Sequence, residues 1–385
     1  MKKQEIFSTT PRLVMGPGCL PSITDELKRF GASSVLVITD PGLVATGIVQ
    51  KLEDILVQDG FAVSRFDNVE ADPPFELANT ALDKLKDARA QAVIGIGGGS
   101  SLDIAKVVSV LATNDEPVTS MFGIDLIKKA GLPLVLIPTT AGTGSEVTPI
   151  VILSDHHEKL KKGIVSPHLY PACALLDPEL TLGLPPKVTA ATGMDALIHA
   201  VEAYTSRNAT AMSDVLAVEA ITLIFSNIRT AFADGANIAA RTKMLRGSML
   251  AGMAFANAGV TAVHAFAYPI GAEFHIPHGI ANTIMLVPVM QFNMIGNLER
   301  FAGIAKMFGQ PTESLSMRQA AQKAIDAMSE LSDDLRVPRQ LRDFGVKADD
   351  VPELAAGVMK VTRLLNNNPR KLELADAEDI YRAVL

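Results

Sequence analysis

Short apolar runs alternate with amphipathic stretches through the first half of the chain. The run at 34–39 is β-branched and apolar, which is typical of a strand buried on both faces. Residues 48–60 follow with apolar side chains at helical spacing, which predicts an amphipathic helix. The order strand, helix, strand, helix predicts a mostly parallel sheet covered by helices on both faces. Further strands are predicted over 61–66, 92–96 and 134–137, and further helices over 75–89 and 102–113.

The second half of the chain has a different pattern. After the paired prolines Pro185 and Pro186, long stretches with a period of 3.6 residues dominate and strand-like runs are scarce. We therefore predict an α/β domain over 1–184 and an all-helical domain over 185–385. The predicted helices of the second domain cover 188–206, 213–233, 238–258, 316–331 and 351–364.

The composition of the 385-residue chain excludes several classes of protein. Hydrophobic residues make up 48% and charged residues 20%, which excludes wholesale disorder. A net charge of −7 without a basic cluster argues against a nucleic-acid partner. The sequence has no uninterrupted apolar run of ~18 residues and no secretory signal pattern, so we expect neither a membrane span nor export. Two cysteines, Cys19 and Cys173, cannot form a disulfide framework, and the expected location is the cytoplasm.

A glycine-rich segment directly follows the predicted strand over 92–96. Gly97, Gly98, Gly99 and Ser100 stand where the following helix opens. Glycines let backbone N–H groups come close to a phosphate, and a helix N-terminus favours the anion. The spacing is not the G-x-G-x-x-G fingerprint. Taken alone, the segment can bind a phosphate or form a tight turn from strand to helix.

Two more polar positions lie at predicted strand ends. The segment 138–146, with sequence PTTAGTGSE, follows one strand, and Asp40 follows another. Ligands in open α/β sheets bind beyond the carboxyl ends of strands, so these loops together favour one extended ligand. A carboxylate at Asp40 can accept hydrogen bonds from a ribose diol and repel a 2′-phosphate, which favours NAD(H) over NADP(H). The alternative is a plain Asp-Pro-Gly turn.

A carboxylate and three histidines in the second half form a candidate metal site. Asp195 and His199 are spaced i, i+4 on a predicted helix and share one face. Their neighbours are apolar, and a buried carboxylate is costly unless it is paired or bound to a metal. With His264 and His278, the set suits a borderline ion such as Fe(II) or Zn(II). Spacing alone leaves open that these histidines are separate core or surface residues.

Taken together and in this order, these segments resemble the iron-containing (group III) alcohol dehydrogenase family along almost the whole chain. The resemblance is carried by four motifs: Gly97-Gly98-Gly99-Ser100 with Asp103 and Lys106; the segment 138–146; Gly193-Met194-Asp195 with His199, Glu202, Ala203 and Tyr204; and Pro277-His278-Gly279 with Asn282.

The resemblance implies an N-terminal dinucleotide-binding domain and a helical metal-binding domain, with the site in the cleft between them. It implies a homodimer or larger homo-oligomer. Asp72 stands where the family often has Asn or Asp before a proline. The implied metal, Fe(II) or alternatively Zn(II), falls on Asp195, His199, His264 and His278. The implied NAD(H)-binding residues are Asp40, Gly98, Gly99, Ser100, Asp103, Thr139, Thr140, Thr143 and Lys161.

One position departs from the family pattern. Many members carry another histidine four residues after the third metal ligand, proposed for proton relay, whereas this chain has Tyr268. Tyr268 is the candidate catalytic residue, acting through its hydroxyl, unless it only shapes the pocket; His275 is another polar candidate. The change indicates a subgroup with its own substrate, for example an aldehyde that bears an anionic group.

The resemblance implies reversible NAD(H)-dependent oxidation of a small primary alcohol, with aldehyde reduction as the physiological direction. Hydride would be transferred at a metal-polarised oxygen. Ile150 and Phe255 are expected as apolar wall residues. Alternatives on the same fold are maleylacetate reductase, glycerol dehydrogenase and a dehydroquinate synthase-like lyase. An alternative of another class is a non-catalytic NAD or metal sensor.

Overall fold

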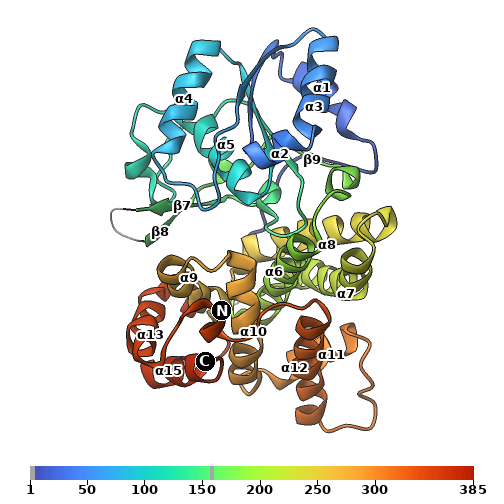
Figure 1. The fold of residues 1–385 in the computed structure, drawn as a ribbon, viewed down its shortest axis with the longest axis vertical. Helices are drawn as coiled ribbons and strands as arrows, with labels where there is room; N and C mark the ends of the chain where they lie inside the picture. The colour runs from blue at the N-terminus through green and yellow to red at the C-terminus, as the bar shows by residue number, and fades with distance from the viewer. Residues whose placement is uncertain (1–4, 157–159) are drawn as a thin grey trace. The chain divides into compact units, whose positions relative to one another are not determined.

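The computed structural model describes residues 5–156 and 160–385, and these fall into two compact units. The α/β unit spans Thr9–Gly183. The helical unit spans Leu184–Leu385 and includes the described residues up to Ser8. In Figure 1 the α/β unit is coloured from blue to green, and the helical unit from yellow-green to red.

The α/β unit is built on a six-stranded sheet in which all paired neighbours are parallel. This arrangement confirms the predicted fold class. The four predicted strands form, and two short strands near the ends of the unit complete the sheet. In spatial order the strands are β1 (Leu13–Met15), β9 (Cys173–Leu176), β6 (Leu134–Pro138), β4 (Ala92–Gly97), β2 (Ser34–Ile38) and β3 (Ala62–Phe66).

Helices cover both faces of this sheet because its central strands are apolar on both sides. Leu36 and Ile38 of β2 pack with α4 (Leu77–Ala88) and α5 (Gly99–Leu111). The alternate residues Val35 and Val37 point to the other face, with α1 (Ile23–Arg29) and α3 (Ile48–Gln58). Such two-sided burial explains why the strands read as unbroken apolar runs.

A smaller sheet in the same unit was not predicted. It contains β5 (Gly123–Ile124), β8 (Leu160–Val165) and β7 (Ile150–Asp155) in that order. β7 and β8 are antiparallel, whereas β5 and β8 are parallel. A short helix, α2 (Pro41–Ala45), follows β2 directly.

The second unit is helical throughout its described residues, as the sequence predicted. One predicted helix is wrong in extent: residues 351–364 do not form a continuous helix, because the backbone breaks at Val361 with a ψ of 51°. Residues 260–294 were not predicted as helices, because they are apolar nearly all round and show no amphipathic period. The helices are α6 (Pro186–Thr205), α7 (Ala211–Ala233), α8 (Ile238–Ala258), α9 (Ala262–Phe274), α10 (His278–Met294), α11 (Leu298–Met307), α12 (Met317–Asp334), α13 (Val351–Lys360), α14 (Thr362–Leu365) and α15 (Leu374–Arg382).

Helix α6 is central to this unit, because α7, α8 and α10 all pack against it. The contact with α10 is unusually close. A Cβ atom added to Gly279 would lie only 2.3 Å from the carbonyl oxygen of Ala191, so only glycine fits there. The first turn of α10 is therefore held directly against α6.

One described helix, α7, is long and apolar enough by length and composition to cross a membrane. Asp214, Glu219 and Arg229 interrupt its apolar residues, so the sequence has no unbroken apolar run here. Of its most apolar 18-residue window, 39% is buried. α7 packs along α6 and α8, as a structural helix of this unit does.

Candidate functional site

The predicted nucleotide-binding residues of the first unit lie at the carboxyl edge of the main sheet. β3 and β4 pair with opposite sides of β2, so the direction of strand order reverses between β2 and β4. Open α/β sheets bind ligands at such a switch point. Asp40 follows β2 there; its Oδ1 accepts from the Leu43 N–H at 2.9 Å, which caps α2, and its Oδ2 accepts from the Ser101 hydroxyl at 3.5 Å.

The glycine segment and the threonine segment meet at this edge. β4 and β6 are neighbours, and the Thr139 N–H donates to the Gly97 carbonyl at 3.0 Å. A Cβ added to Gly99 would lie 2.7 Å from Thr143 Cγ2, and one added to Gly98 would lie 3.8 Å from Thr140 Cγ2. Helix α5 starts at Gly99, so its unpaired first N–H groups and positive dipole end lie among these residues. Ser100 stands in that first turn.

Asp103 and Lys106 fasten α5 to the segment that follows Thr143. Asp103 accepts from the Ser145 hydroxyl at 2.6 Å and from the Ile152 N–H at 2.9 Å. Lys106 Nζ donates to Thr148 Oγ1 at 3.1 Å and to the Ile150 carbonyl at 2.9 Å. Both oxygens of Asp103 thus bond to this segment, and Ile150 contributes its backbone here.

These two residues belong to a buried charged cluster that also contains Glu146. Burial lowers the pKa of Lys106 to about 8, although the carboxylates of Asp103 and Glu146 oppose this. Burial likewise raises the pKa of Glu146 to about 7. Glu146 Oε1 has no hydrogen-bond partner among the described residues. The cluster includes the last residue of the segment 138–146 and is bonded to that segment through Ser145.

Lys161 lies on β8, and its ammonium donates to Asp72 Oδ1 at 2.6 Å. Asp72 has a positive φ of 51°, a conformation that side chains other than glycine adopt rarely. Asp72 and Lys161, two positions that the family resemblance singled out, are therefore in contact. The carboxylate of Asp72 holds the Lys161 side chain in place.

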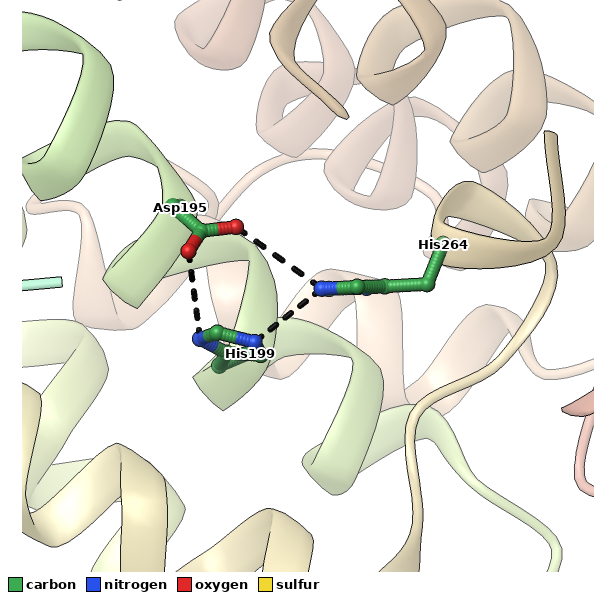
Figure 2. A group of neighbouring side chains, drawn as sticks. All are labelled: Asp195, His199 and His264. Atoms are coloured by element: carbon green, nitrogen blue, oxygen red, sulfur yellow. Dashed lines mark hydrogen bonds and ion pairs between the residues drawn. The ribbon is translucent and has the colours of Figure 1, made fainter. Parts of the chain in front are cut away.

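The predicted metal ligands of the helical unit come together from three helices. Asp195 and His199 lie one turn apart on α6, His264 lies near the start of α9, and His278 is the first residue of α10. Ligand atoms of Asp195, His199 and His264 all lie within 4.8 Å of one another, and all three side chains are buried (Figure 2). His278 Nε2 lies 3.8 Å from Asp195 Oδ1.

Glu202 fixes the orientation of His264. Its Oε2 bonds to His264 Nδ1, and its Oε1 accepts from Thr261 Oγ1 at 2.6 Å and from the Val263 N–H at 2.8 Å. When Nδ1 carries the proton, the lone pair of Nε2 points toward Asp195 and His199. No role is predicted for Glu202 from the sequence, although it lies three residues after His199 and extends the same polar stripe on α6.

Asn282 is a second residue that the sequence did not assign. Its amide Nδ2 donates to Asp195 Oδ1 at 2.8 Å and lies 3.2 Å from His264 Nε2 and 3.1 Å from His278 Nε2. Its Oδ1 is buried without a partner among the described residues. Asn282 is one helical turn after His278, so a Pro-His-Gly-x-x-Asn pattern is the sequence signal for it.

This donor set fits a divalent transition metal. Burial by itself raises the pKa of Asp195, but His199, His278 and His264 more than offset it, so the pKa is lowered overall and the carboxylate stays ionised. One carboxylate and three imidazoles are typical ligands of Fe(II) or Zn(II). Two imidazole nitrogens, His199 Nε2 and His264 Nε2, face each other at 3.0 Å, an arrangement that a shared cation stabilises.

Tyr268 and Phe255 border this cluster. Tyr268 lies one turn after His264 on α9, and its ring centre is 6.3 Å from that of His278. Burial raises the pKa of its phenol. The Phe255 ring stacks on His199 with 4.3 Å between ring centres. His275 ends α9 with a positive φ of 53°, and within the described ranges it makes no hydrogen bond with the cluster.

Comparison with known proteins covers both units. Residues 10–178 match the iron-containing alcohol dehydrogenase family, and residues 189–385 match the C-terminal region of the Fe-containing alcohol dehydrogenase family. A long-chain-alcohol dehydrogenase 1 of Geobacillus thermodenitrificans is 42% identical, with 96% of this chain and 94% of the relative covered. A sulfoacetaldehyde reductase of Bilophila wadsworthia is 39% identical, with 95% of each covered. The crystal structure of a 1,3-propanediol oxidoreductase has a TM-score of 0.97 and 37% identity over 100% of both chains.

Glu202→Gln will weaken metal binding about 10- to 100-fold, because the amide cannot hold the His264 Nδ1 proton as a carboxylate does. The measurement is a titration of the stripped protein with Zn(II) against a competing chelator. Glu219→Gln, at an exposed position on α7, is the matched control and will leave the affinity unchanged. Equal affinity in Glu202→Gln and the wild type would show that Glu202 does not orient the ligand.

Glu146→Gln will change how stability depends on pH. The folded-state pKa of Glu146, about 7, lies above its ordinary 4.5, so the wild type loses stability as pH rises through this range. The glutamine variant lacks that loss and will gain about 1–3 kcal/mol relative to the wild type between about pH 5 and about pH 7.5. Urea unfolding followed by far-UV circular dichroism measures it, because the chain has no tryptophan.

Glu70→Gln, at an exposed position of the same unit, serves as the control for that experiment. Parallel pH dependence of the wild type and Glu146→Gln would contradict the assignment of the titration to Glu146.

Proposed function

The chain belongs to the iron-containing alcohol dehydrogenase family, and we propose that it is a metal-dependent oxidoreductase that uses NAD(H) to interconvert a small aldehyde and its primary alcohol. The observation that carries this proposal is the convergence of Asp195, His199, His264 and His278 from three helices. Aldehyde reduction is the proposed physiological direction. The similarity to a sulfoacetaldehyde reductase supports including aldehydes with an anionic group among the candidate substrates.

The α/β unit is proposed to be the dinucleotide-binding domain. The N-terminus of α5 would hold the pyrophosphate through backbone N–H groups at Gly98, Gly99 and Ser100. The Asp40 carboxylate would accept hydrogen bonds from a ribose diol. The bound nicotinamide supplies the hydride. Additional contacts are proposed for Thr139, Thr140, Thr143 and Lys161, while Asp103 acts by holding the loop that carries Thr143.

The helical unit is proposed to be the metal-binding catalytic domain. Asp195, His199, His264 and His278 would hold Fe(II), with Zn(II) as the alternative. A divalent cation held there supplies Lewis acidity toward a carbonyl or hydroxyl oxygen. Glu202 keeps the Nε2 lone pair of His264 directed at the ion's position.

Two neighbouring side chains complete the proposed chemistry. The apolar Phe255 ring covers one face of His199 and excludes water there. The raised pKa keeps the Tyr268 phenol protonated at neutral pH, so its hydroxyl can donate a proton toward the reacting oxygen.

Neither cysteine takes part in the proposed reaction. Cys19 and Cys173 are both free thiols. Burial raises the pKa of Cys19 to about 11 and that of Cys173 to about 12, so both stay protonated and unreactive. We propose a cytoplasmic homo-oligomer, in keeping with free thiols and with the family resemblance.

Purified protein loaded with Fe(II) or Zn(II) will consume NADH with short aldehydes, as followed by NADH absorbance. A chelator will abolish turnover, and added metal will restore it, because a divalent ion held by the four ligands would supply the Lewis acidity that the reaction needs. Turnover that survives complete metal removal would contradict the role of the four ligands. No turnover with any aldehyde, despite bound metal and NADH, would overturn the proposed function in favour of a lyase or a sensor.

Asp40→Ser will shift cofactor preference toward NADPH, raising kcat/KM for NADPH relative to NADH by about 10-fold or more. Serine removes the charge that repels a 2′-phosphate and still caps α2. Steady-state kinetics with both cofactors measure the ratio. Asp83→Ser, at an exposed position on α4, is the control for removal of one negative charge. An unchanged ratio in Asp40→Ser would assign Asp40 to the turn alone.

A further inference from the structure

Arg363 is a charged residue near the candidate metal centre to which neither the fold nor the proposed mechanism assigns a task. It lies on the short helix α14, where Leu364 is buried and the Arg363 side chain is exposed. Over residues 5–156 and 160–385 its guanidinium makes no hydrogen bond or ion pair. Other arginines of the unit are held: Arg300 bonds to both carboxylate oxygens of Asp214, for example.

The backbone that carries Arg363 is fixed to α9, the helix of His264 and Tyr268. Asn367 Nδ2 donates to the Val260 carbonyl at 3.0 Å, and Asn368 Oδ1 accepts from the Ala262 N–H at 3.3 Å, just where α9 begins. Asn368 also pairs with the buried Asn293 through two amide hydrogen bonds, of 2.7 and 2.8 Å. Both α13 and α14 pack on α9.

On the other side of Arg363, α13 approaches α9 at the residue after Tyr268. A Cβ added to Gly357 would lie 3.1 Å from Pro269 Cγ, so the two helices touch there. Close contacts thus hold the chain both before and after Arg363. Its guanidinium can reach only a limited region around this part of α9.

The charge of Arg363 influences the Tyr268 hydroxyl, in keeping with the packing of α13 and α14 on α9. Burial is the largest influence on the pKa of Tyr268, which it raises, and the charge of Arg363 is the influence that opposes it. Asp195 and Glu202 also act on the Tyr268 hydroxyl. That hydroxyl is therefore influenced both by the arginine and by the metal-site carboxylates.

The balance of charge favours an anionic ligand at this place. Asp195 and Glu202 are the two carboxylates bonded within the metal-site cluster. Together they carry two negative charges, which one divalent ion neutralises. Arg363 is therefore not needed to neutralise these two carboxylates. A guanidinium offers a planar fork of N–H donors that matches carboxylate and sulfonate oxygens, and an exposed one is open to a ligand.

We propose that Arg363, together with the Tyr268 hydroxyl, binds an anionic group on the substrate, so that the substrate class is a short aldehyde that carries a carboxylate or a sulfonate. The inference rests on the proposed function, because it requires the carbonyl end of the same molecule to be at the metal centre. Arg363 is a specificity-determining residue in this proposal, and Tyr268 gains a second task beside proton donation.

The test compares anionic aldehydes with neutral aldehydes of the same shape. Sulfoacetaldehyde is paired with tert-butylacetaldehyde, and succinic semialdehyde with isocaproaldehyde, so that the two pairs separate a sulfonate from a carboxylate preference. The wild type will favour the anionic member of at least one pair in kcat/KM. Arg363→Met will reduce that ratio about 10- to 100-fold, the range expected for one charge-assisted contact. Arg363→Lys will be intermediate, because it keeps the charge and loses the fork.

Lys360→Met is the matched control, since Lys360 is exposed on α13 three residues earlier and carries the same charge. It will leave the ratio unchanged. A second readout does not depend on turnover: calorimetric titration with ethanesulfonate and with propionate will detect binding to the metal-loaded wild type and weaker binding to Arg363→Met.

The outcomes separate the two proposals. Reduction of neutral and anionic aldehydes with equal kcat/KM, or a ratio that Arg363→Met preserves, overturns the role of Arg363 and leaves the proposed function in place. Absence of any aldehyde reduction overturns the proposed function. In that case the calorimetric titrations still test the anion site. If each anion binds the wild type and Arg363→Met with the same affinity, the anion site is overturned as well. If the anions bind the variant more weakly, the anion site is supported.

Discussion

Two carboxylates buried on α6 are the constraint on which the helical unit depends. Asp195 and Glu202 are almost completely shielded from solvent on a helix that is otherwise largely apolar. A buried charge costs several kcal/mol unless hydrogen bonds and counter-charges compensate it, so the surrounding segments must supply donors. Glu202 receives three donors from the start of α9, where the positive end of the helix dipole adds to them. Asp195 receives the Asn282 amide of α10. The carboxylates thereby attach α9 and α10, with their histidines, to α6.

In the α/β unit the main constraint is the close approach of the start of helix α5 to the ends of two strands, β4 and β6. Gly95 in β4 allows it, because a Cβ there would lie 2.7 Å from both Ala105 Cβ of α5 and Leu136 Cδ2 of β6. α5 can therefore lie directly on the sheet. Asp103 and Lys106 then extend from the same helix to hold the loop beyond β6. One helix presents its N-terminus to the edge and anchors the neighbouring loop.

How much of this was predictable depends on the range of the interactions. The core strands and most helices followed from local patterns, since burial on one or both faces leaves a period in the sequence. β1 is too short to give such a signal, and β8 carries a lysine on each face, Lys161 and Lys162, so its pattern is neither continuously apolar nor alternating. The pairing of Asp195 with His199 was predictable because one helix turn separates them. Residue types made His278 a candidate beside them, but spacing left its place open, because its position depends on the Gly279 contact with Ala191, which leaves no local pattern. Helical spacing alone places Glu202 on the same face of α6 as Asp195 and His199, so its position was predictable, but its bond to His264 was not.

The two buried charge clusters differ in one respect that bears on the metal. In the α/β unit the protein supplies its own cation, since Lys106 lies among Asp103 and Glu146. In the helical unit, within the described part of the chain, no lysine or arginine pairs with Asp195 or Glu202; their charged neighbours are histidines. Imidazole is neutral or charged depending on its partner, and neutral imidazole is the form that ligates. A cluster of two carboxylates and three imidazoles that excludes lysine and arginine is thus complete only when a cation comes from outside the chain. Arg363 influences the Tyr268 hydroxyl beside this cluster and, among the described residues, pairs with neither carboxylate, which is why we propose it as the partner of a ligand that brings its own negative charge.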